Sequence, residues 1–116
     1  MTAHAYRVES IRHAICNGVL EIEHANFIDV ETARLYATKG ISVTPTLVKY
    51  KAMSEPPYEE FLPPPGRKKN KRVLESGVNA LKILRDEGVN ICFGRDLLAG
   101  MQEFRIRTKH YRPLNY

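Results

Sequence analysis

The sequence predicts an α/β fold in which parallel strands are joined by helices. A repeated phrase carries this prediction: a helix ends at a glycine, an extended run follows, and a polar residue stands at its end. The phrase occurs at residues 18–24, 40–46 and 88–96. Glycine tolerates the left-handed backbone that ends a helix, and β-branched and aromatic residues favour the extended run. Because no hairpin signal separates the runs, the intervening helices predict crossovers between parallel strands.

The elements can be assigned in order along the chain. We expect helices at residues 8–17, 30–39 and 71–87 and strands at residues 19–23, 41–44 and 89–93. Asp29 is the predicted N-cap of the second helix, and the strongly apolar last strand should be central in the sheet. Parallel strands end at one edge, so His24, Thr46 and Asp96 should emerge together there. In α/β folds this edge binds ligands.

Two segments depart from this pattern. The proline-rich residues 50–66 predict a rigid, extended loop that could form a lid or wall over a site. Residues 67–72, with the sequence RKKNKR, carry much of the net charge of +5. Such a run can contact phosphates. No aromatic stacking platform accompanies it, so we favour a solvated loop that leads into a helix over a nucleic-acid site.

Composition indicates one small domain. The chain has 116 residues, of which 43% are hydrophobic and 27% are charged. We assign residues 1–100 to the domain and residues 101–116 to a basic C-terminal tail. Cys16 and Cys92 fit buried thiols in a reducing compartment. No apolar run reaches the ~20 residues of a membrane helix and no signal peptide is visible, so we expect a cytoplasmic protein with no membrane association.

A series of short motifs stands in order along the chain. The motifs are His4-Ala5-Tyr6, Gly18-Val19, Ile22-Glu23-His24-Ala25, Ile28-Asp29, Glu31-Thr32-Ala33, Pro45-Thr46-Leu47, Gly88-Val89 and Phe93-Gly94-Arg95-Asp96-Leu97-Leu98. Taken together, they resemble the amidohydrolase superfamily, in particular its imidazolonepropionase-like amidohydrolases and Xaa-Pro dipeptidases. The resemblance implies a partial (β/α)8, or TIM-type, barrel that corresponds to about strands five to eight, the C-terminal half of the family fold.

The same resemblance implies a site and an activity. His4 and His24 would ligate a divalent metal, most often zinc, while Asp96 would act as both metal ligand and catalytic base. Tyr6 would approach the scissile carbonyl. Neutral imidazole is a good zinc ligand, and a carboxylate can take a proton from a metal-activated water. The implied reaction is hydrolysis of an amide-type C–N bond in a small-molecule amide or a dipeptide.

The chain also departs from the family. It lacks the first-strand His-x-His pair and the strand-four lysine, and a barrel of this type needs roughly 250 residues. Ala25 replaces the usual glycine, and Arg95 replaces a small residue beside Asp96. We therefore expect the lone chain to be an incomplete or inactive fragment. Its exposed strand edges would favour a homo-oligomer or a complementing barrel half as partner.

Simpler interpretations stand beside these. His4 could be a disordered N-terminal histidine, His24 a core or helix-capping histidine, and Asp96 an ordinary N-cap or loop acid. Arg95 could also pair with Asp96. The competing function is a non-catalytic α/β interaction protein that uses its basic segment to contact acidic partners.

Overall fold

A computed structural model describes residues 1–97 of the chain. Leu98 and the predicted tail at residues 101–116 lie outside the described residues. The elements are β1 (Thr2–Arg7), α1 (Val8–Cys16), β2 (Glu21–Phe27), α2 (Val30–Lys39), β3 (Ser42–Thr44), α3 (Leu47–Ala52), α4 (Pro64–Asp86) and β4 (Asn90–Ile91).

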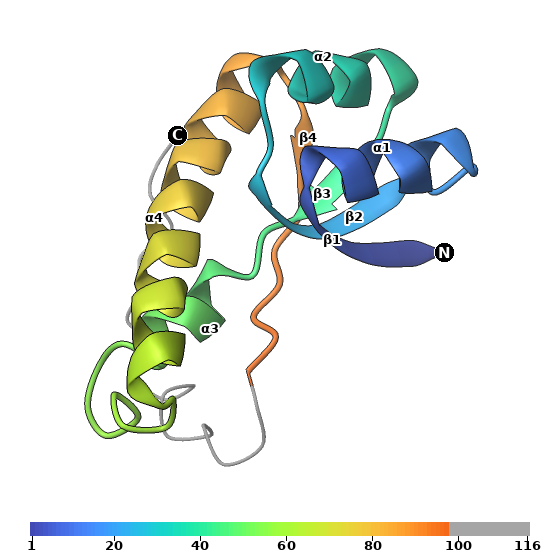
Figure 1. The fold of residues 1–116 in the computed structure, drawn as a ribbon. Coiled ribbons are helices and arrows are strands. Elements are labelled where there is room, and N and C mark those ends of the chain that lie inside the picture. The colour runs from blue at the N-terminus through green and yellow to red at the C-terminus, as the bar shows by residue number, and fades with distance from the viewer. Residues whose placement is uncertain (98–116) are drawn as a thin grey trace.

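The strands form one sheet of four in the order β1-β2-β3-β4, and every neighbouring pair is parallel (Figure 1). The predicted α/β class with crossover helices is therefore confirmed. A parallel sheet in chain order, with helices packed along it, is consistent with part of an α/β barrel. Which strands of such a barrel are present stays a prediction.

The main core lies between the sheet and helices α1, α2 and α4, which flank it in Figure 1. Its fully buried members include Ile11, Ile22, Tyr36, Val43 and Leu84. Each of the aliphatic side chains among them contributes about 1.5–3 kcal/mol of transfer free energy. A second cluster packs α3 against the first half of α4.

The local signals that delimit the elements are borne out. Gly18, Gly40 and Gly88 have φ values of 82°, 65° and 71°, the left-handed geometry predicted after each helix. The Asp29 carboxylate accepts a hydrogen bond of 2.7 Å from the backbone N–H of Thr32, as expected of an N-cap.

Helix α4 begins seven residues earlier than predicted, at Pro64 rather than Lys71. Proline suits the first turn of a helix because its missing N–H would have no partner there. The basic residues 67–72 therefore lie within a helix, and residues 50–66 are not one extended loop, because α3 occupies their beginning. Although α4 has 23 residues, no described helix is long and apolar enough to cross a membrane.

Three further expectations are wrong. Strand β4 is short and at the edge of the described sheet rather than central, which leaves Phe93 79% exposed. Strand β2 starts two residues later than expected and continues past His24, because it pairs with β1 as far as Phe27. Cys16 and Cys92 are exposed free thiols, since one ends α1 and the other follows the edge strand.

Candidate metal centre

The candidate site lies where β1 and β2 run side by side. His4 of β1 is in register with Glu23, and Ala5 with His24. Successive side chains of a regular strand alternate between faces, but His24 has a φ of 80° and Ala25 a φ of 48°. This left-handed stretch breaks the alternation, and the register shifts opposite it. The irregularity accounts for the adjacent Glu23 and His24 both lying near His4. Non-glycine residues with positive φ and bulges recur at functional sites.

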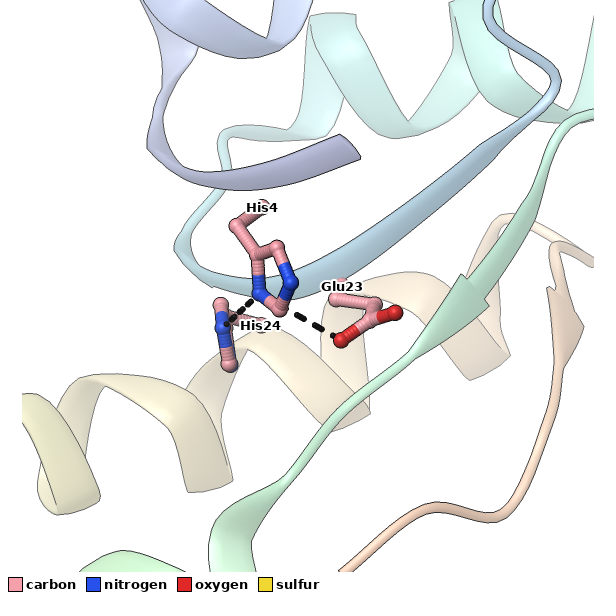
Figure 2. Close-up of side chains that lie close together, drawn as sticks. All are labelled: His4, Glu23 and His24. Atoms are coloured by element: carbon pink, nitrogen blue, oxygen red, sulfur yellow. Dashed lines mark hydrogen bonds and ion pairs between the residues drawn. The ribbon is translucent and has the colours of Figure 1, made fainter. Parts of the chain in front are cut away.

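Three donor side chains meet at this irregularity. The ligand atoms of His4, Glu23 and His24 all lie within 4.8 Å of one another. Figure 2 shows the His4 ring between the other two groups. His4 Nδ1 is 2.8 Å from His24 Nε2 and 3.3 Å from Glu23 Oε2. Two imidazole nitrogens and a carboxylate oxygen form a donor set that suits zinc.

His24 is the most enclosed member of the group, with 2% of its surface exposed. Its Nδ1 lies 2.6 Å from the Thr46 hydroxyl oxygen. A proton on Nδ1 that is donated to Thr46 leaves the lone pair of Nε2 directed toward the cluster. Burial, and then the charge of Lys49, lower the pKa of His24. Both effects favour the neutral imidazole, the form that binds metals.

Two tyrosines complete the wall around this histidine. The ring of Tyr6 stacks on His24, with ring centroids 4.5 Å apart and planes inclined by 13°. The hydroxyl of the buried Tyr50 donates a hydrogen bond of 3.0 Å to the Tyr6 hydroxyl and lies 3.5 Å from His24 Nδ1. Burial raises the pKa of Tyr50, so the phenol stays protonated. Tyr6, expected from the resemblance, therefore lies beside the cluster.

Asp96 stands apart from the donor group found among the described residues. Its carboxylate forms an ion pair with Lys49 Nζ, and its backbone is left-handed with a φ of 49°. The alternative is that Asp96 pairs with Arg95, but the Arg95 guanidinium lies over the Phe93 ring instead. The roles of Asp96 as ligand and base stay predictions.

A cavity of about 920 Å³ opens next to the cluster. His4 and Tyr6 line it, and so do Leu62 from the proline-rich segment and Gly66 from α4. The cavity is large enough for a small molecule.

Sequence reasoning missed Glu23, Lys49 and Tyr50. Glu23 is adjacent to His24 in the sequence, but successive side chains of a regular strand point to opposite faces, so strand periodicity gives no reason to group the two as ligands. No sequence signal identifies Lys49 or Tyr50 as neighbours of the site, because both depend on where α3 packs.

Several solved structures match the chain, among them a prolidase, an amidohydrolase and a Xaa-Pro dipeptidase. A prolidase complexed with N-methylphosphonate-L-proline is 39% identical, with a TM-score of 0.78 over 93% of this chain and 28% of its own. An amidohydrolase is 41% identical, with a TM-score of 0.77, and the match covers 94% of this chain and 28% of the amidohydrolase. A Xaa-Pro dipeptidase with methionine bound in its active site is 25% identical, with a TM-score of 0.71, and the match covers 91% of this chain and 28% of the dipeptidase.

The chain thus spans 28% of the length of these relatives. No protein-family model and no curated protein matches it. Over more than nine-tenths of its own length it nevertheless shares their fold. This confirms its resemblance to the prolidases and other hydrolases of the amidohydrolase superfamily.

Proposed function

We propose that the chain provides part of the active site of a metal-dependent amidohydrolase, which cleaves an amide-type C–N bond in a dipeptide or a cyclic amide. The observation that carries the proposal is the convergence of the ligand atoms of His4, Glu23 and His24, which lie within 4.8 Å of one another on the two adjacent parallel strands β1 and β2. The amidohydrolase and prolidase relatives support the reaction class.

The donor set fits a divalent metal, for which zinc is our first choice. His24 would be the anchor, because its buried ring is already oriented by Thr46. His4 and Glu23 would complete three protein ligands, the usual number at a catalytic zinc site. When bound, such a metal would lower the pKa of a coordinated water and polarise the amide carbonyl.

The remaining groups would act on the substrate and its protons. Asp96 would accept a proton as general base, provided that its carboxylate is released from Lys49. Tyr6 would direct its hydroxyl toward the carbonyl oxygen, because its ring stacks on His24 and lines the cavity. The hydrogen bond that Tyr50 donates holds the Tyr6 hydroxyl in position.

A dipeptide that ends in proline is the first substrate class to test, since one relative binds N-methylphosphonate-L-proline. The wild-type chain should bind this phosphonate by calorimetry when zinc is present. Binding should fall at least tenfold after chelation or in His24→Ala. It should persist in His13→Ala, which removes an exposed histidine on α1. Equal binding with and without zinc, or by His24→Ala, would contradict the proposal.

We further propose that β1 to β4 correspond to about strands five to eight of a barrel. The open edges of the sheet would then accept a complementing barrel half or a second copy of the chain. The lone chain would have little activity because the site lacks the ligands of the other strands.

The alternative function is an interaction protein that contacts acidic partners. One observation favours it: the cations of residues 67–72 are all exposed on the first turns of α4. A metal-free chain that binds a polyanion with steep salt dependence would support this alternative.

A further inference from the structure

The short helix α3 directs three polar side chains toward the candidate metal centre. Thr46 is its N-cap, and Lys49 and Tyr50 follow three and four residues later, a spacing that places them on one face. Thr46 and Tyr50 both approach His24 Nδ1. Lys49 lies on the same face, with its Nζ 5.3 Å from the centroid of the Tyr50 ring.

Lys49 is unusually enclosed for a lysine. Its side chain is 14% exposed, and that of its partner Asp96 is 34% exposed. Lysine is seldom buried unless it is paired. The charges of both residues act on the nearby His24. Because Thr46 and Tyr50 on the same helix face approach His24, this cation lies on the side of α3 that faces the candidate metal centre. It also holds the carboxylate that the sequence predicted as a ligand.

We propose that Lys49 is an internal cation that competes with the metal, so that it limits metal affinity by repelling the incoming ion and by retaining Asp96. This inference rests on the proposed metal site, and it assigns Lys49 a positioning role. Metal binding would require the Asp96 carboxylate either to leave the ammonium or to stay outside the coordination shell.

Electrostatics fixes the direction of the effect. A positive charge near a divalent ion opposes binding, and the interaction is strong where water is partly excluded. Replacement of Lys49 by methionine keeps an unbranched side chain against Tyr50 but removes the charge. It also frees Asp96 to become a further donor. Both consequences tighten binding, and we expect an increase in affinity on the order of tenfold.

The test measures zinc and cobalt dissociation constants of the full chain by competition with a chelator, for wild type, Lys49→Met and Lys49→Arg. The Lys49→Arg variant keeps the positive charge and should bind metal with nearly the affinity of wild type. The matched control is Lys51→Met on the same helix, whose side chain is 51% exposed and pairs with Glu55. It removes an equal charge and should change affinity less than twofold. Thermal unfolding of each metal-free variant verifies that it folds.

Asp96→Asn supplies the second arm. If Lys49 acts partly through Asp96, Lys49→Met should tighten binding less in the Asp96→Asn background than alone. Unchanged or weaker binding by folded Lys49→Met would overturn the inference about Lys49 while leaving the metal site intact. Absence of metal uptake by every variant, wild type included, would overturn the proposed function as well.

Discussion

Replacement of Gly77 by alanine tests how closely α4 approaches the strand that carries His24. A Cβ atom at this position would lie 2.3 Å from Leu47 Cδ2 and 2.5 Å from Asn26 Nδ2. Asn26 is buried, and its Nδ2 donates a hydrogen bond of 3.2 Å to the Val73 carbonyl. The added methyl group therefore has no free space and must displace both the buried amide of Asn26 and the side chain of Leu47.

The magnitude follows from opposing terms. Alanine is favoured over glycine in a helix by about 1 kcal/mol. Overpacking a filled interior costs about 1–3 kcal/mol, and disturbing the buried hydrogen bond of Asn26 costs about 1 kcal/mol more. We expect the free energy of unfolding to fall by about 2 kcal/mol in total. At about 4 °C per kcal/mol for a domain of this size, the melting temperature should fall by about 8 °C.

Urea and thermal unfolding followed by circular dichroism measure this change. Asn79→Ala, at an exposed position two residues along α4, is the matched control and should leave stability equal or slightly higher. A rise in the melting temperature of Gly77→Ala would refute the reasoning, because it would mean that helix propensity dominates and α4 does not press on β2.

Three other substitutions test single contacts. Asp29→Ala should lower stability by about 1 kcal/mol at pH 7, whereas Asp29→Asn, which keeps an acceptor oxygen, should lose less. Hydrogen bonds from Thr32 lower the pKa of Asp29. The difference in stability between wild type and Asp29→Ala is therefore fully present above the unfolded-state pKa of about 4, and it shrinks as the pH falls through the lower folded-state pKa. Melting temperatures of the two proteins that keep a constant difference from pH 7 to pH 2 would contradict this. Glu23→Gln should weaken zinc binding at least tenfold by chelator competition, and Glu21→Gln on the same strand should not; equal affinities would exclude Glu23 as a ligand. Tyr50→Phe should cost about 1 kcal/mol in urea unfolding, since it removes the bond to the Tyr6 hydroxyl, and unchanged stability would show that water replaces this bond.

The fold could be predicted largely from local signals. Gly18, Gly40 and Gly88 end helices by a backbone geometry that other residues resist, so their spacing reveals the alternation of helices and strands. Pro64 was misread because proline signals both loops and helix starts, and only the packing of the following turns decides between them. The apolar residues 89–93 predicted a central strand, yet among the described residues no further strand pairs with the outer edge of β4.

The site was predictable only where it depends on residue type. His4 and His24 were identified as metal-ligand types, and the structure brings them together. The position of Glu23 depends on the left-handed backbone at His24, which strand periodicity does not reveal. The Lys49–Asp96 pair depends on tertiary packing that spans 47 residues of sequence.

Metal stoichiometry tests the central claim most directly. After incubation with zinc and exhaustive dialysis, the wild-type chain should retain about one zinc per molecule by elemental analysis, as a site with three protein ligands requires. His13→Ala should retain the same amount, and His24→Ala should retain almost none. Equal zinc in His24→Ala, or no zinc in the folded wild-type chain, would contradict the account.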